Sequence, residues 1–453
     1  MKKTRMLAMA LAVALCLAAL VGCGDSGSGD PTTTGNDATP PQTTENNEGT
    51  DPVVIKYWTW FPNEDQLKPV IAAFETANPG IKIELTAMES KAYQEKLPIS
   101  LSTKEDIDVV GVQPSAMVEQ VKTFLAELDP IMSSVVGSDW KSRVHAADLA
   151  ACEDLAGGEL KVMPLFRSGA MIGYYNAKML SDWGLTVPNT IEEYRDFAEK
   201  VREKDPSVLP AVYAGKEAWV NDEMMLNVLG QSGDYYNKFR YENASVDSQE
   251  FIDAMNGFKK FFDYDIFSMD IMDLDYGRAH EMFCTGKAAT YYQGTWEAGI
   301  LSEQIRADNG VALEDVGIMA LPVVKAGDKA TLRSYLDCTV AIVEYSTKQE
   351  AAARWIEFLA MGDGVDHWAK FFCGTPSKVG FVMDASLLGT KTEQDGFALL
   401  NTLVAEATAD RNNVSGYSDI EGASVQKVVT GAATAEDEVK ELQKEWGSGK
   451  YGG

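Results

Sequence analysis

Hydrophobic periodicity near the start of the folded part limits the folds open to this chain. Residues 53–61, 81–85 and 107–112 carry apolar, β-rich patterns that predict strands. Between the first two strands, apolar residues recur at helical spacing from Leu67 and stop at an Ala-Asn-Pro-Gly turn, and residues 92–102 predict a second helix. Strand, helix, strand, helix, strand predicts α/β structure with parallel strands and right-handed crossovers.

Aromatic and amide side chains stand where ligands of such sheets bind, beyond the carboxyl ends of the strands. Trp58, Trp60 and Phe61 end the first strand, and Gln113 follows the third. A pyranose offers a C–H face that stacks on a flat ring and a rim of hydroxyls that need hydrogen-bond partners. We therefore expect a carbohydrate site here. Because Trp58 and Trp60 alternate along one strand, core packing of one of them is the alternative.

Later segments resemble, in order, the extracellular solute-binding proteins of family 1, which are the sugar-binding components of ABC importers. The segments MFCTGKAATYYQGTWEAG and VGIMALPVV are similar to segments that follow in the same order in that family. The resemblance extends over residues 53–446. A strand, Pro, turn, strand and helix pattern carries it at Pro164, Tyr174, Tyr175, Asn176, Lys178, Gly184, Leu185, Pro188 and Thr190.

The resemblance implies a two-lobed, periplasmic-binding-protein-like α/β fold. Each lobe would be a mostly parallel sheet flanked by helices, and crossing hinge strands would join the lobes near residues 164–169, 287–291 and 334–339. The expected first lobe is residues 53–165 plus 289–335, and the expected second lobe is residues 166–288 plus 336–453.

Further ligand-binding residues are expected on the second lobe and at the first crossing. Trp219, Trp296 and Tyr417 stand where the family presents aromatic rings, and Asn221 and Glu297 would bind hydroxyls. Packing within a lobe or a solvated turn is the alternative for each of them. Arg167, in the first crossing, would contact ligand or bridge the lobes.

The amino-terminal segment predicts export and anchoring. Lys2, Lys3 and Arg5 precede an unbroken apolar run, so residues 1–22 are expected to be a signal peptide. Leu-Val-Gly-Cys resembles the lipobox of bacterial lipoproteins, which implies an acylated Cys23 and an extracytoplasmic protein anchored to the cell membrane by lipid alone. Ordinary secretion is the alternative. Residues 23–52 lack large apolar residues and predict a disordered linker.

The formal charge of −28 disfavours nucleic acid and anionic membrane surfaces as partners. Beyond the signal and anchor, Cys152, Cys284, Cys338 and Cys373 form no CxxC pair. The sequence leaves open whether they form disulfides or stay free.

The expected function is that of a monomeric substrate-binding lipoprotein that delivers a carbohydrate to ABC permease subunits, without catalysis and without a cofactor. No GxSxG, HExxH or P-loop motif is present, and the three histidines are far apart. A secreted carbohydrate-active enzyme, a surface lectin and a binding protein for another solute remain alternatives. The aspartates of residues 263–275 do not match an EF-hand loop, so a solvated acidic turn is favoured over a calcium site there.

Overall fold

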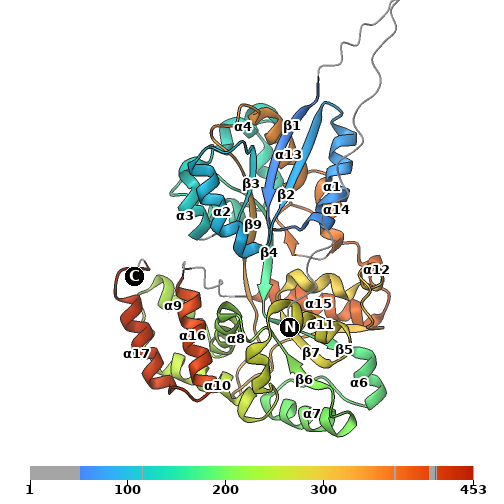
Figure 1. Ribbon diagram of the computed structural model, residues 1–453, viewed down its shortest axis with the longest axis vertical. Helices are drawn as coiled ribbons and strands as arrows, with labels where there is room; N and C mark the ends of the chain where they lie inside the picture. Colours follow the sequence, from blue (N-terminus) through green and yellow to red (C-terminus); the bar gives the residue numbers. More distant parts are fainter. Residues whose placement is uncertain (1–50, 115, 372–373, 408–413, 415, 452–453) are drawn as a thin grey trace, which may run out of the picture. The chain divides into compact units, whose positions relative to one another are not determined.

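The computed structural model describes residues 51–114, 116–371, 374–407, 414 and 416–451. The predicted signal peptide, Cys23, nearly all of the predicted linker and Cys373 lie outside these residues. Two sheets organise the described chain (Figure 1). The first sheet has the order β10 (Thr375–Pro376), β4 (Met163–Ala170), β9 (Arg333–Ile342), β3 (Val109–Val112), β1 (Val53–Thr59), β2 (Ile81–Ala87). The second has the order β6 (Leu209–Val212), β7 (Ala288–Gln293), β5 (Ile172–Asn176), β8 (Val316–Met319).

Helices accompany both sheets. Those of the first lobe are α1 (Glu64–Ala77), α2 (Ser90–Ser102), α3 (Ala116–Val121), α4 (Leu128–Val135), α5 (Ala146–Leu155), α13 (Gln349–Ala360) and α14 (Gly364–Trp368). Those of the second lobe are α6 (Ala177–Trp183), α7 (Ile191–Lys204), α8 (Ala218–Gln231), α9 (Tyr235–Tyr241), α10 (Gln249–Asp263), α11 (Tyr276–Cys284), α12 (Glu303–Asp308), α15 (Lys391–Glu406), α16 (Tyr417–Val429) and α17 (Ala435–Trp446). Short 3-10 helices are η1 (Lys122–Phe124), η2 (Trp140–Arg143), η3 (Met269–Asp273), η4 (Thr295–Leu301), η5 (Ala369–Phe371) and η6 (Ala385–Leu387).

The predicted strand and helix alternation at the start of the first lobe is confirmed. β1 pairs in parallel with β2 on one side and with β3 on the other. α1 starts at a capping box, in which the Asn63 side chain accepts from the Gln66 N–H and the Gln66 side chain accepts from the Asn63 N–H. Because β1 and β3 are parallel neighbours, their carboxyl ends bring Trp60 and Gln113 to the same edge of the sheet.

The two-lobed α/β fold is confirmed, but the sheets are mixed rather than mostly parallel. β9 lies between β3 and β4 and is antiparallel to both. In the second sheet only β6 and β7 pair in parallel, while β5 is antiparallel to β7 and β8. A strand that returns from the other lobe can enter a sheet in either direction, so the early parallel pattern does not extend to it.

The two lobes have separate hydrophobic cores, and the cores divide the chain differently from the expected boundaries. The first core takes residues from 55–166 and again from 336–369. The second core takes residues from 170–332, Tyr335 and residues 388–446. Residues 289–335 therefore pack with the second lobe rather than the first, and residues 336–369 with the first, because β9 and α13 complete the first sheet and its cover.

Strands β4 and β9 form two of the expected crossings. Their ladder runs from Met163 paired with Val340 to Ala170 paired with Arg333, and Figure 1 shows the two strands side by side. The crossing expected near residues 287–291 is instead β7, which lies between β6 and β5 in the second sheet. The chain changes core a third time between Ala369 and Leu388, where Met383 packs against both cores.

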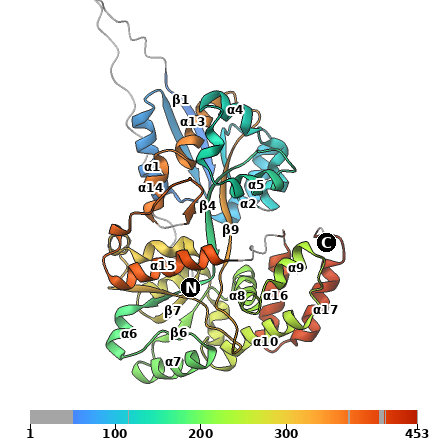
Figure 2. The ribbon, with the colours of Figure 1, turned by 180° about the vertical axis from the view of Figure 1, so that it is seen from behind.

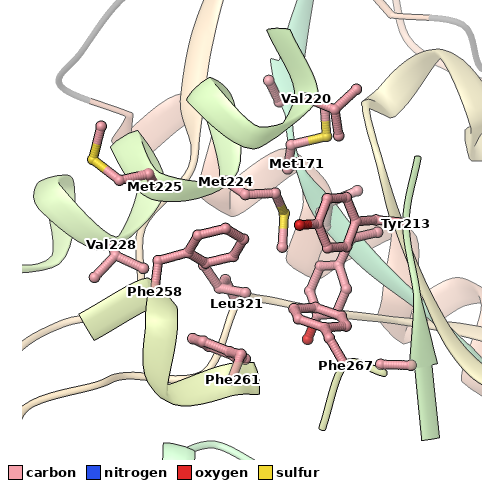
Figure 3. Close-up of a cluster of buried hydrophobic side chains, with 14 of the residues drawn as sticks. Met171, Tyr213, Val220, Met224, Met225, Val228, Phe258, Phe261, Phe267 and Leu321 are labelled. Atoms are coloured by element: carbon pink, nitrogen blue, oxygen red, sulfur yellow. The ribbon is translucent and has the colours of Figure 1, made fainter. Parts of the chain in front are cut away.

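Aromatic and methionine side chains fill the second core. Tyr213 packs edge to face on Phe267 at 4.9 Å between ring centroids, and Phe258 lies 6.1 Å from Tyr213. Figure 3 shows these rings around Met224 of α8. Helices α8, α10, α16 and α17 pack on one another beside this cluster (Figure 2). The cluster gives α8, which carries Trp219, a rigid base.

Candidate functional site

The loop after β1 presents the first-lobe candidates on a fixed backbone. Trp60 is half-buried, and its ring lies 5.6 Å from that of Tyr93. The Tyr93 hydroxyl donates to the carbonyl oxygens of Trp58 and Gly111 at 3.1 and 2.7 Å. One buried tyrosine thus ties the ends of β1 and β3 together beneath Trp60.

The neighbours of Trp60 are more deeply packed. Trp58 is buried, with 7% of its surface exposed, and the ammonium group of Lys96 lies 4.4 Å from its ring. Phe61 is half-buried against Phe166 at 5.5 Å. Of the two alternating tryptophans, Trp60 is therefore the one that keeps ring surface at the strand end.

Gln113 and Arg167 are both engaged within the first lobe. The Gln113 side chain is half-buried and accepts from the amide of Gln94 at 3.4 Å. Arg167 donates from Nε to Asp148 at 2.6 Å, and its side chain is 32% exposed. The Arg167 contact holds α5 against β4, so the ion pair described here lies inside one lobe rather than between the two.

The second-lobe aromatic candidates meet each other. Trp219, in the first turn of α8, and Trp296, in η4, have ring centroids 6.1 Å apart and ring planes tilted by 44°. Both are half-buried against the second core. The sequence placed them 77 positions apart, and the fold brings them into one aromatic pair.

Glu297 lies in a polar network under this pair. The Tyr276 hydroxyl donates to Oε1 of Glu297, and the indole N–H of Trp296 donates to the Tyr276 oxygen at 3.1 Å. Nδ1 of His280 lies 3.1 Å from the other carboxylate oxygen, Oε2. The contacts to Cys284 and Glu297 raise the pKa of His280 to about 10, so its imidazole is positively charged at neutral pH.

Asn221 and Tyr417 lie inside the second lobe. Asn221 is fully buried in α8, accepts from the Tyr213 hydroxyl at 2.8 Å and donates to the carbonyls of Gly215 and Glu217. Tyr417 is fully buried and packs edge to face on Trp446 at 4.9 Å. These contacts are those of core residues.

Tyr276 and His280 belong to the site network and were missed in the sequence. They begin a helix face in which Tyr276, His280 and Cys284 follow at intervals of four residues along α11. Asp275 caps this helix by accepting from the Arg278 N–H at 3.0 Å. The aspartate-rich sequence before it favours a solvated acidic turn over a calcium site, but the Asp cap and the four-residue spacing are the signals that indicate this helix.

A hollow of about 360 Å³ lies apart from these residues. Its lining consists of residues 230–233, residues 327–331, Leu403 and Glu406. None of the candidate ligand residues belongs to it.

Cysteines and acidic residues form neither a bridge nor a cation site in the described part of the chain. Cys152, Cys284 and Cys338 are buried, and no disulfide joins any two of them. Within the residue ranges given above, no group of three or more His, Cys, Asp or Glu side chains is placed to hold a metal ion, and those ranges include the aspartates of residues 263–275. None of the helices described is both long and apolar enough to cross a membrane.

Comparison with known proteins gives a family match over most of the chain. The family model described as bacterial extracellular solute-binding protein matches residues 61–360.

Solved structures agree in fold at low sequence identity. A protein studied for xylan utilization by the thermophilic bacterium Caldanaerobius polysaccharolyticus is 18% identical, with a TM-score of 0.73 over 87% of this chain and 100% of that one. A maltose-bound protein of T. maritima is 18% identical, with a TM-score of 0.68 over 87% and 98%. A sugar transporter protein of Bacillus licheniformis in complex with stachyose is 19% identical, with a TM-score of 0.62 over 87% and 99%.

Proposed function

The chain belongs to the family of bacterial extracellular solute-binding proteins, and from this premise we propose that it captures a carbohydrate, in particular an oligosaccharide, between its two lobes. The observation that carries the proposal is the Trp219 and Trp296 pair, half-buried on the second lobe. Trp60 at the end of β1 supplies a half-buried ring on the first lobe. Flat rings match the C–H faces of pyranoses.

Ligand capture proceeds by hinge closure in this proposal. Contacts that the ligand makes with both lobes exist only in the closed state, so binding shifts the population toward closure. The paired strands β4 and β9 are the expected pivot. The maltose and stachyose complexes of proteins with the same fold support a sugar as the ligand.

The membrane-related part of the proposal concerns anchoring and delivery. The family is extracellular, which places its members outside the cytoplasm. We propose that acylated Cys23 holds this protein, as a monomer, beside ABC permease subunits that accept its ligand. A Cys23→Ala variant expressed in a bacterium that processes lipoproteins should leave the membrane fraction for the medium. Unchanged membrane retention would contradict lipid anchoring at Cys23.

A thermal-shift screen against mono- and oligosaccharides tests the sugar proposal. A ligand that binds only the folded protein adds about 2.7 kcal/mol to the free energy of unfolding at 100 times its dissociation constant. We expect at least one oligosaccharide to raise the melting temperature. Stabilisation by amino acids, peptides or metal ions alone would overturn the sugar assignment.

Substitution of one tryptophan of the aromatic pair tests its role in binding, and a tryptophan elsewhere in the second lobe serves as the control. Trp296→Ala should weaken binding of the active sugar by about 30-fold or more, as loss of a central aromatic contact does in other interfaces. Trp183→Ala removes another half-buried tryptophan of the second lobe, on α6, and should leave the affinity unchanged. Equal effects of both variants would indicate general destabilisation.

An incubation with the same oligosaccharides separates a binding protein from a carbohydrate-active enzyme. Glycoside hydrolysis typically uses two carboxyl groups, one on each side of the scissile bond. We expect the sugars to be recovered intact. Cleavage that the Glu297→Gln variant abolishes would replace the binding proposal by an enzymatic one.

A further inference from the structure

The ring of Trp296 is held in place from three sides. A Cβ atom added at Gly294 would lie 2.2 Å from two ring carbons of Trp296, so the ring occupies the space that any larger residue would take. The indole N–H donates to Tyr276 at 3.1 Å, and Trp219 covers another side at 6.1 Å between centroids. Gly294 has φ −72° and ψ 168°, so its backbone would accept other residues and the ring contact is what requires glycine.

The segment that carries Trp296 is itself fixed. The Gly169 N–H of β4 donates to the Thr295 hydroxyl at 2.9 Å, and the Tyr174 hydroxyl donates to the Gly294 carbonyl at 2.8 Å. The tryptophan therefore stands on a backbone anchored to a hinge strand on one side and to the second sheet on the other.

Tyr276 is the polar group that locks the ring, and it is held in turn by Glu297. Both carboxylate oxygens of Glu297 have partners in the protein, Oε1 the Tyr276 hydroxyl and Oε2 the His280 ring at 3.1 Å. Burial raises the pKa of Tyr276 well above its usual range, so the phenol keeps its proton. The groups that face His280 are Glu297, Cys284 at 3.2 Å and the ring of Tyr291.

We propose that Tyr276, supported by Glu297 and His280, is a positioning residue that fixes the plane of Trp296 before the ligand arrives. The inference rests on the proposed sugar-binding function and changes the role expected for Glu297. Its two oxygens are engaged below the ring, and the only indole donor of Trp296 is taken by Tyr276. Trp296 thus offers the ligand an apolar face, and its preset pose spares rotamer entropy on binding.

Nuclear magnetic resonance of the indole N–H groups tests this without ligand. The Trp296 signal is identified by its loss in Trp296→Phe. Tyr276→Phe removes only the hydroxyl, and we expect the Trp296 signal to move, as it should in Gly294→Ala, where the new Cβ displaces the ring. The control is Tyr235→Phe, which deletes a hydroxyl that donates to Ser245 in the same lobe at 3.1 Å. An unmoved Trp296 signal in Tyr276→Phe would overturn the inference.

Calorimetric titration with the sugar found in the screen completes the test. Loss of one hydrogen bond predicts an affinity about threefold to tenfold lower in Tyr276→Phe and no change in Tyr235→Phe. A shifted Trp296 signal with unchanged affinity would overturn the positioning role while leaving the sugar proposal intact. If the wild-type protein binds no sugar, the proposed function fails first, and this inference falls with it.

Discussion

Gly422 of α16 lies directly against the carbonyl group of Ala218 at the start of α8: a Cβ atom added at Gly422 would lie 1.8 Å from that oxygen. Only glycine allows the two helix backbones to approach this closely. The contact is next to Trp219, so the placement of an aromatic candidate depends on a residue 203 positions later in the chain.

Gly422→Ala is expected to lower the free energy of unfolding by about 1–3 kcal/mol or more, because the blocking atom is backbone and one helix must shift. Urea unfolding followed by circular dichroism measures this. The thermal-shift screen against sugars should show weaker sugar binding by this variant, since α8 carries Trp219. Gly80→Ala is the control, because a Cβ there meets no atom within 4 Å. Equal stability of the two variants would contradict the close contact.

Two buried carboxyl groups between the same helices predict a pH-dependent stability. Asp222 of α8 and Glu421 of α16 are fully buried, and burial raises the pKa of both, that of Glu421 to about 7. Protons therefore bind the folded protein more tightly than the unfolded chain. The stabilisation is complete below pH 4.5, the ordinary pKa of glutamate, and is lost as the pH rises through about 7.

The free energy of unfolding, measured between pH 4.5 and 8, should thus show that the stabilisation by these two carboxyl groups declines as the pH rises. Glu421→Gln, which mimics the protonated group, should flatten that part of the profile. Glu95→Gln, at an exposed position of α2, should keep the wild-type slope. A slope unaffected by Glu421→Gln would show that the carboxyl group is ionised in the folded protein.

Arg306 anchors the η4 segment through a buried ion pair. Its guanidinium donates to Glu393 at 2.6 Å and to the carbonyls of Ile300, Leu301, Leu313 and Glu314, with 2% of the residue exposed. Arg306→Met leaves one oxygen of the buried Glu393 carboxylate, Oε1, and several carbonyls without their Arg306 donor, so we expect a loss of about 3–5 kcal/mol in chemical unfolding. Arg354→Met breaks an exposed pair with Glu350 and should cost less than about 1 kcal/mol.

The three buried cysteines predict slow thiol chemistry in the folded protein. Cys152, Cys284 and Cys338 are buried, and burial raises the pKa of Cys152, which disfavours its reactive thiolate. Alkylation with iodoacetamide followed by peptide mass spectrometry should label these three sites slowly in buffer and rapidly in urea. A disulfide-linked peptide that joins two of them would contradict the described structure.

Local patterns were sufficient for the first five elements of the chain but not for their completion. The alternation from Val53 predicted β1, α1, β2, α2 and β3, since each depends on neighbours in sequence. The position of β9 between β3 and β4 depends on pairing with residues about 170 to 230 positions away. A local hydrophobic pattern does not predict such pairing. The lobe boundaries differed for the same reason.

The placement of the candidate residues was predictable where they follow strands and less so inside helices. Trp60 and Gln113 follow strands, as expected. Asn221 and Tyr417 both belong to helices, where Asn221 accepts from Tyr213 and donates to nearby carbonyls. The partners of Asn221 lie four to eight residues earlier in the chain, in the segment that leads into α8, and the composition of this segment resembles that of a loop.

The late place of β9 in the chain affects the order in which the protein can assemble during synthesis. Until residues 333–342 emerge from the ribosome, β3 and β4 each present an unpaired strand edge to water, although more than 160 residues have followed β4. Such edges are open to pairing with other chains. The first lobe therefore cannot complete its sheet until most of the polypeptide has been translated.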